Sequence, residues 1–328
     1  MLEILLIVPG VFLLMKGADY FVESASSLSK RLKVTPIVIG LTVVAFGTSA
    51  PELSVNMLAA INNNTDIAFG NIVGSNIANI LLILGISATI SKLSVNSNTI
   101  WKEIPFSLLA AILLSLFALQ NVLDSKNFQI NFSQNTSIGE ITFTHGLVLL
   151  SVFIIFLYYT FGIAKNSNDD YKDEIKIMSL GKSITIIILS LITIILGGKL
   201  TVDAAVTMAK LFGISESLIG LTIVAVGTSL PELITSIVAA KKGEADLAIG
   251  NVVGSNIFNI FFILGLTATL KNIPVTTNGL IDIFVLVGVT VYTFLSLFVF
   301  EKHKLGKFEG FSLILIYIIY TIYLIIRG

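Results

Sequence analysis

The sequence predicts an all-α integral membrane protein, with ten transmembrane helices arranged as two inverted five-helix repeats. Composition gives the first reason: 55% of the 328 residues are hydrophobic and 12% are charged, with a mean hydropathy of +0.95. Soluble chains carry about a quarter charged residues. Apolar runs of about 20 residues, the length with which a helix crosses a ~30 Å hydrocarbon core, recur along the whole chain. The third reason is that the two halves of the chain repeat each other.

Polar or Pro/Gly-marked turns separate the apolar runs. The N-terminal run carries Glu3 where a signal peptide has positive charge, so we expect it to be the first span. The alternating segments typical of a membrane β-barrel are not evident. Two polar connections, 120–145 and 165–182, are too short to form separate domains. The expected spans are 2–28, 35–61, 67–91, 100–119, 143–164, 182–209, 214–240, 246–270, 279–300 and 308–326.

An internal repeat defines the domain organisation. Residues 40–89 align with 220–269 at a constant offset of 180, without gaps, and 29 of the 50 pairs are identical. We therefore expect a first half, residues 1–164, joined by a loop, 165–181, to a second half, residues 182–328. Because each half contains an odd number of spans, the second half enters the membrane from the opposite side.

Basic residues set the expected orientation. With the N-terminus outside, the connections that face inside hold 14 of the 20 Lys and Arg residues. We expect a protein of the cell (plasma) membrane with both termini outside.

Two acids within apolar spans are the first candidate functional residues. Glu52 lies in GTSAPEL, 47–53, and Glu232 lies in GTSLPEL, 227–233. Placing a charge at the centre of a membrane helix costs about 2.5–3.5 kcal/mol, and acids in spans are functional by default. Neither motif contains a Lys or Arg that pairs with its acid. A bound cation is therefore the natural partner.

Other oxygen atoms accompany each acid. Thr48 and Ser49 precede Glu52 by four and three residues and so share its helix face, and Thr228 and Ser229 do the same for Glu232. Proline has no N–H, so Pro51 and Pro231 leave a carbonyl four residues earlier without its helical donor. Those carbonyls belong to Gly47 and Gly227, where glycine also lets the helix bend.

The following span in each half carries the rest of the signature. In GNIVGSNIANI, 70–80, Ser75 and Asn79 are four residues apart, as are Ser255 and Asn259 in GNVVGSNIFNI, 250–260. The pairs Gly70/Gly74 and Gly250/Gly254 predict close approach to a neighbouring helix.

The candidate ligands are all oxygens, with no His and no Cys among them. Such a set suits hard cations, and Ca²⁺ takes 6–8 oxygens in flexible geometry. Two ionised glutamates are neutralised by one Ca²⁺ or by monovalent cations spread over the same oxygens. One site is thus expected to serve two ions in turn.

The two GTSxPEL and GNxxGSNxxNI blocks closely resemble the α-repeats of the cation/calcium exchanger superfamily, specifically its sodium/calcium exchanger branch and the prokaryotic homologues. The resemblance covers essentially the whole chain. It implies ten helices in two inverted halves, with the second, third, seventh and eighth spans around ion sites near the midplane. The proton-coupled branch tends to have GNxxE at the acidic motif, so the Thr-Ser-x-Pro-Glu form favours sodium coupling.

The resemblance also implies ligand roles for individual residues. The calcium site would use Glu52 and Glu232 with the backbone carbonyls of Thr48 and Thr228. Reasoning from the prolines selects the carbonyls of Gly47 and Gly227 instead, and both alternatives stay open. The sodium sites would use carbonyls of Ala45 and Ala225 and the hydroxyls of Ser49, Ser75, Ser229 and Ser255.

Position 259 departs from part of the family. Some prokaryotic members and the potassium-dependent branch have Asp there, whereas this chain has Asn at both 79 and 259. Animal sodium/calcium exchangers resemble it in this respect. The difference counts against potassium co-transport and leaves the two glutamates as the only titratable groups of the expected core.

We therefore expect a secondary antiporter that exchanges Na⁺ for Ca²⁺ by alternating access, with the first and sixth spans as the moving pair. A Ca²⁺/H⁺ antiporter is the alternative, and a cation channel and an intramembrane hydrolase are weaker ones. We expect no enzyme activity, no cofactor and no obligatory protein partner. The chain has no Cys, a net charge of +0 and no basic stripe, which counts against thiolate chemistry and nucleic-acid binding.

Overall fold

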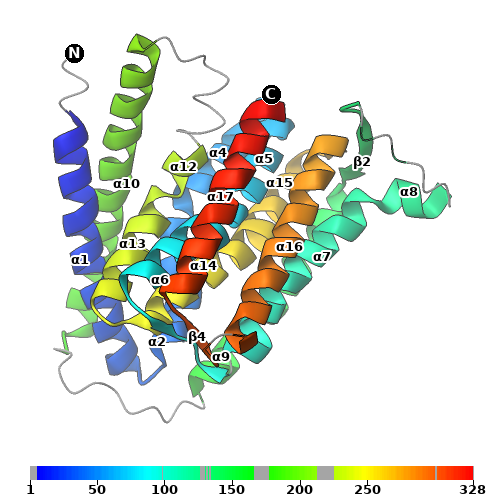
Figure 1. The fold of residues 1–328 in the computed structure, drawn as a ribbon. Helices are drawn as coiled ribbons and strands as arrows, with labels where there is room; N and C mark the ends of the chain where they lie inside the picture. Colours follow the sequence, from blue (N-terminus) through cyan, green and yellow to red (C-terminus); the bar gives the residue numbers. More distant parts are fainter. Residues whose placement is uncertain are drawn as a thin grey trace.

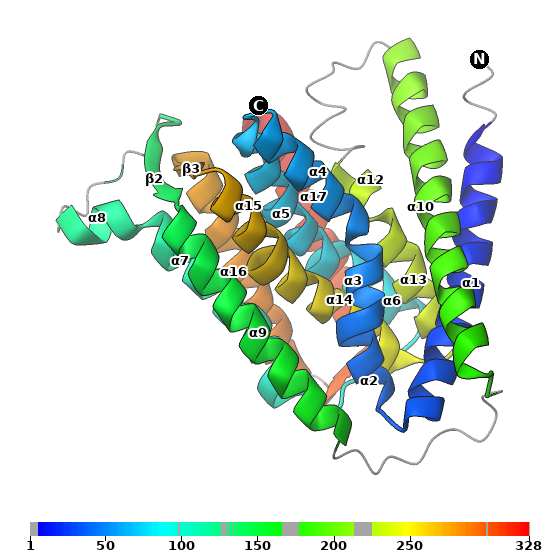
Figure 2. The same ribbon diagram turned by 180° about the vertical axis from the view of Figure 1, so that it is seen from behind.

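A computed structural model describes residues 6–97, 99–125, 130, 132, 134–165, 177–212, 225–299 and 301–327. The molecule is a helical bundle in which α1 (Ile7–Leu32) and α10 (Leu180–Leu211) form a pair along one side of a larger block (Figures 1 and 2). The start of α1 and the end of α17 (Lys307–Arg327) lie at the same end of the bundle.

Several spans are built from short consecutive elements. In the first half, α1 is followed by α2 (Pro36–Ile39), η2 (Gly40–Val44), α3 (Ala45–Thr48), α4 (Ala50–Ile61), α5 (Thr65–Ala78), η3 (Asn79–Ile83), α6 (Leu84–Ile90), η4 (Thr99–Glu103), α7 (Ile104–Ala118), α8 (Gln120–Ser125) and α9 (Phe143–Lys165). In the second half, α10 is followed by α12 (Ala225–Thr228), α13 (Leu230–Lys241), α14 (Ala245–Ile257), η6 (Phe258–Leu264), α15 (Gly265–Leu270), α16 (Thr277–Val299) and α17.

The fold is that of a helical membrane protein, as the sequence predicts. Within the described residues, seven helices are long and apolar enough to span a membrane, and the bent pair Pro36–Thr48 and Ala50–Ile61 makes an eighth. Residues 214–224 of the expected seventh span lie outside the described residues. The described segment 225–241 follows them directly. The helix α1 has the length of a span, but each 18-residue stretch of it contains Lys16, Asp19 and Glu23.

The expectation of an all-α protein is wrong in one detail, because two antiparallel ribbons connect the halves. β1 (Leu93–Ser94) pairs with β4 (Lys304–Leu305), and β2 (Ser137–Ile141) pairs with β3 (Ile273–Thr276). The polar connection 120–145 therefore contains a helix and a strand. Each ribbon joins a strand that follows a long span of one half to a strand that precedes the last span of the other.

An ion pair lies beside the β1–β4 ribbon, between the residues that precede its two strands. The Lys92 ammonium lies 2.6 Å from Oε1 of Glu301, and this hydrogen bond lowers the pKa of the exposed Glu301 carboxyl.

The second span bends where the sequence predicts it. Its two parts meet at an angle of 46°, and the break falls at Ser49, whose ψ of 9° departs from the helical value. Ser229 breaks the matching helix of the second half with the same ψ of 9°. In both places a proline follows two residues later, where its missing N–H and its ring stop a regular helix from continuing.

Wider π-type turns occupy the middle of both spans that carry the GSN motif. The segment η3 begins at Asn79, and η6 begins at Phe258, one residue before Asn259. Such turns disturb the regular hydrogen-bond ladder and are frequent at functional sites.

Close packing against the second span explains two glycines of the GSN motif in the second half. A Cβ on Gly250 would lie 3.0 Å from Cα of Gly40, and one on Gly254 would lie 2.8 Å from Cα of Leu41. The prediction of a small-residue step is thus confirmed for Gly250 and Gly254. The matching neighbours of Gly70 and Gly74 fall outside the described residues, so that half of the prediction stays a prediction.

The last span of each half packs on the other half. α9 packs along α15, with Gly146 against Gly265, and α17 packs along α6, with Gly310 against Gly85. The α1 and α10 pair is likewise reciprocal, because a Cβ on Gly197 would meet Gly10 and Leu14, and one on Gly17 would meet Ser190 and Ile194. Sequence positions 180 apart thus exchange places across the bundle.

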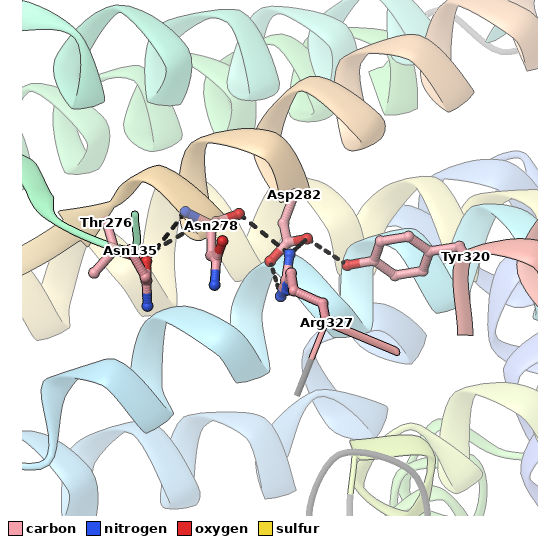
Figure 3. A network of polar contacts seen from close by, with 7 residues as sticks. Asn135, Thr276, Asn278, Asp282, Tyr320 and Arg327 are labelled. Carbon is pink, nitrogen blue, oxygen red and sulfur yellow. Dashed lines mark hydrogen bonds and ion pairs between the residues drawn. The ribbon is translucent and has the colours of Figure 1, made fainter. Parts of the chain in front are cut away.

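A second ion pair fixes the end of the last helix. Arg327 makes two hydrogen bonds of 2.8 and 3.0 Å with the carboxylate of Asp282 on α16, and the Tyr320 hydroxyl donates to the same carboxylate at 3.0 Å (Figure 3). The backbone N–H of Asn278 donates to Oδ1 of Asn135 at 3.3 Å, which ties the 120–145 connection to the same corner.

We expect Gly250→Val to destabilise the protein by about 1–3 kcal/mol, because the added atoms meet backbone that has no room to move. Gly288→Val is the matched control, since no atom lies within 4 Å of a Cβ at this exposed helical glycine. Thermal unfolding in detergent measures both. Equal unfolding temperatures for the two variants would contradict the packing described here.

Candidate ion-binding site

The two predicted glutamates are buried at the centre of the bundle. Glu52, in the first turn of α4, is 0% exposed, and Glu232, in the first turn of α13, is 1% exposed. Neither takes part in the salt bridges found among the described residues. Both helices begin beside a proline and a serine, so the break that starts each helix also brings its glutamate to the core.

The hydroxyl partners of each carboxylate come from the opposite half. The Ser49 hydroxyl donates to Oε1 of Glu232 at 2.9 Å, and the Ser229 hydroxyl donates to Oε1 of Glu52 at 3.1 Å. The sequence expectation, in which Ser49 serves Glu52 on its own helix, is therefore wrong about the partner. Ser49 and Ser229 are also the residues at which the helices break, and their hydroxyls bond across the bundle.

The threonines of the motif also reach across. Thr48 donates to Oδ1 of Asn251 at 3.0 Å, and Thr228 donates to Oδ1 of Asn71 at 3.2 Å. Sequence reasoning missed both asparagines as functional residues. Their signal was present, because Asn71 and Asn251 belong to the identical pairs of the repeat and precede the GSN motif in both halves.

The GSN spans bring the remaining predicted side chains to the same place. The hydroxyls of Ser75 and Ser229 are 3.2 Å apart, and Ser75, Ser255, Asn79 and Asn259 are all buried. Within the described residues, several buried oxygens there have no hydrogen-bond partner: Oε2 of Glu52, Oε2 of Glu232, Oγ of Ser255, Oδ1 of Asn79 and Oδ1 of Asn259.

Among the backbone carbonyls, Ala45 has the clearest geometry. Its oxygen accepts the N–H of Ser49 at 3.0 Å and the hydroxyl of Thr48 at 3.4 Å. The side chain of Ala225 lies outside the described part of the chain. A ligand role for this carbonyl, and for the carbonyls of Thr48, Thr228, Gly47 and Gly227, stays a prediction.

The donor set fits a hard cation. Buried polar atoms are nearly always hydrogen-bonded, so a group of unpartnered buried oxygens around two carboxylates requires an explanation. Among the described residues, no cluster of three or more His, Cys, Asp or Glu exists, which leaves the two glutamates to supply the charge. Carboxylate, amide and hydroxyl oxygens are the ligands that Ca²⁺ and other hard cations take.

Comparison with known proteins decides the family. The family model described as "Sodium/calcium exchanger protein" matches residues 2–162 and 182–326. The chain belongs to the sodium/calcium exchanger family.

Similar proteins cover almost the whole chain. Sodium/calcium exchanger MaX1 of Methanosarcina acetivorans is 33% identical over 98% of this chain and 97% of its own length. Putative antiporter CaxA of Alkalimonas amylolytica is 36% identical over 95% of both chains. A structure of the sodium-calcium exchanger NCX_Mj, soaked with Na⁺ and Sr²⁺, superposes with a TM-score of 0.81 at 32% identity, covering 98% of this chain and 97% of that one.

The two halves of this exchanger are not bonded identically at the site. The Asn251 amide donates to the carbonyl of Glu232 at 3.3 Å and to the hydroxyl of Ser236 at 2.9 Å. In the first half, Asn56 stands in place of Ser236 and donates to the carbonyl of Glu52 at 2.7 Å. Nδ2 of Asn71 and Oδ1 of Asn56 then have no partner in the described ranges.

This difference predicts unequal effects of two equivalent substitutions. Asn251→Ala removes the partner of Thr48, Ser236 and the Glu232 carbonyl, whereas Asn71→Ala removes the acceptor of Thr228. We expect Asn251→Ala to destabilise by about 1–2 kcal/mol more, because unsatisfied buried groups are costly. Thermal unfolding of the two variants in the same detergent measures the difference, and a larger loss for Asn71→Ala would refute it.

Proposed function

We propose that this protein is a secondary antiporter that exchanges Na⁺ for Ca²⁺ by alternating access around a midplane site built on Glu52 and Glu232. The observation that carries the proposal is the pair of buried carboxylates. Each has one oxygen bonded to a serine of the opposite half and one with no partner in the described part of the chain. Family membership supports it, as do the names of MaX1 and NCX_Mj.

The proposed ligands surround these two carboxylates. Hydroxyl oxygens would come from four serines and amide oxygens from Asn79 and Asn259, while backbone carbonyls would come from residues before each break. The full set is Glu52, Glu232, Ser49, Ser229, Ser75, Ser255, Asn79 and Asn259, with the carbonyls of Ala45, Thr48, Ala225 and Thr228. Na⁺ and Ca²⁺ are the transported substrates, and the proposal needs no cofactor and no catalysis.

Competition for the same oxygens couples the two fluxes. Removing an unpaired charge from water costs several kcal/mol, so a site with two bare carboxylates resists closing. Ca²⁺ or a set of Na⁺ ions removes that cost by neutralising the pair. The transporter therefore changes sides only when loaded, and uphill movement of one ion is driven by downhill movement of the other.

The architecture that goes with this function is ten spans in two inverted halves, 1–164 and 182–328, with both termini outside the cell membrane. The reciprocal packing of α9 on α15 and of α17 on α6 supports the inverted relation. The common end of the bundle for the start of α1 and the end of α17 supports an even number of spans (Figure 1).

An unequal packing of the outer pair supports alternating access. α1 packs along α13, and Lys242 after α13 donates to the carbonyl of Asp19 on α1 at 2.8 Å. The repeat makes α10 and α4 the equivalent pair, and within the described residues these two helices hardly touch. An outer pair that lies closer to one half of a symmetric core is the arrangement expected of one of two alternating states.

One prediction of this function concerns the coupling ion. Proteoliposomes loaded with Na⁺ and diluted into Na⁺-free medium should take up ⁴⁵Ca²⁺, whereas matched vesicles loaded with K⁺ or choline should not. Uptake that ignores Na⁺ and follows an imposed pH gradient would replace this function by Ca²⁺/H⁺ exchange. Uptake that needs no counter-ion would indicate a channel.

The second prediction concerns the carboxylates. Glu52→Gln and Glu232→Gln should each abolish Na⁺-driven Ca²⁺ uptake, because one remaining charge no longer balances a divalent ion. Both variants should keep the unfolding temperature of the parent or exceed it, since glutamine removes a buried charge that lacks a basic partner. Near-normal exchange in either variant would exclude the proposed site.

A further inference from the structure

Four buried asparagines form a crossed network between the two GSN spans. Asn76 and Asn256 each donate to the main-chain carbonyl of the other, at 3.2 and 3.3 Å. Asn79 donates to Oδ1 of Asn256 at 3.0 Å, and Asn259 donates to Oδ1 of Asn76 at 2.8 Å. All four side chains are at most 1% exposed.

The network fixes which way each amide faces. A main-chain carbonyl only accepts hydrogen bonds, so Asn256 must turn its NH₂ toward the carbonyl of Asn76. The Oδ1 of Asn256 then faces Asn79, which must donate a hydrogen bond from its own NH₂. Oδ1 of Asn79 is left with no partner among the residues that the structure describes.

The same sequence of contacts runs in the other direction. Asn76 turns its NH₂ to the carbonyl of Asn256 and its Oδ1 to Asn259, and Oδ1 of Asn259 is likewise left with no described partner. Each amide orientation thus depends on the asparagine of the opposite half. Neither half alone would select the oxygen of its own Asn79 or Asn259.

We propose that Asn76 and Asn256 are positioning residues that hold Asn259 and Asn79, respectively, with their oxygens rather than their NH₂ groups toward the transported cation. This inference rests on the proposed function, since it assigns the outward-turned oxygens to the same site. The polar side-chain atoms of Asn76 and Asn256 form hydrogen bonds with the opposite half, so these two residues do not serve as ligands.

The orientation matters because an amide presents opposite charge at its two ends. The segment η3, with Asn79, packs against α13, which carries Glu232, and η6, with Asn259, packs against α4, which carries Glu52. No described residue bonds Oε2 of either carboxylate. An amide released from the network would turn its NH₂ to such an oxygen and take the place of a cation there.

The test is a crossed set of double variants. Asn76→Ala and Asn256→Ala should each weaken Ca²⁺ affinity about 10–100-fold, the usual range when a residue behind a metal ligand is removed. Asn76→Ala should have no further effect once Asn259→Ala is present, but should keep its full effect beside Asn79→Ala. Asn256→Ala should show the reverse pattern.

Two readouts separate positioning from packing. Equilibrium ⁴⁵Ca²⁺ binding in detergent gives the affinity, and Na⁺-driven uptake in proteoliposomes gives KM and maximal rate separately. The effect should lie in the binding constant and in KM. Ser87→Ala, at a buried serine without cross-half partner further along the same span, is the packing control and should leave both unchanged.

The outcomes are distinct. Effects that simply add in all four combinations, or equal losses in the Ser87→Ala control, would overturn the positioning role. If an alanine variant does not purify folded, Asn76→Ser and Asn256→Ser enter the same cycles. The proposed exchange can also fail by itself. If ⁴⁵Ca²⁺ binding to the variants shows the crossed pattern but the parent protein shows no Na⁺-driven uptake, the proposed exchange is refuted and the positioning role stays in place.

Discussion

Two buried carboxylates, which no basic residue of the described chain pairs with, are the constraint on which the rest of the structure depends. An isolated buried charge is expensive, and the bundle offers Glu52 and Glu232 only neutral donors. Those donors are serines of the opposite half, placed there by helix breaks at Ser49 and Ser229. Each half therefore completes the site of the other. The broken helices, the prolines and the close glycine contacts all serve to bring two halves near enough for this exchange of hydroxyl groups.

Hydrogen bonds between the halves also explain how a displacement of one half affects the other. If each carboxylate were satisfied by its own helix, one half could move without disturbing the other. Here a displacement of one half changes the surroundings of both glutamates together. In the proposed exchange, binding of a cation between them would act on the relation of the halves. The α1 and α10 pair, which within the described residues packs along α13 and hardly touches α4, would respond to that relation.

The sequence predicts much of this, and its failures have physical causes. Glu52 and Glu232 stand out because an acid in an apolar span is expensive, and the bend at GTSAPEL follows from proline chemistry. The partner of Ser49 does not follow, because spacing along a helix reveals neighbours on one helix face and not across a tertiary interface. The strand Ser137–Ile141 was missed since five residues give too little alternation. The roles of Asn76 and Asn256 require knowing which residues meet at the centre of the bundle.

The repeat itself is best understood from this geometry. In the proposed site, matching positions of the two halves supply matching ligands, which agrees with the 29 identical pairs within residues 40–89 and 220–269. At the pair Asn56 and Ser236 the residues differ, and so do their hydrogen bonds. Asn56 donates to its own helix, while Ser236 accepts from Asn251. Two states of an exact repeat would be equal in energy by symmetry. For the proposed alternating access, a departure such as Asn56 against Ser236 removes that equality and would favour one side without changing the proposed ligands.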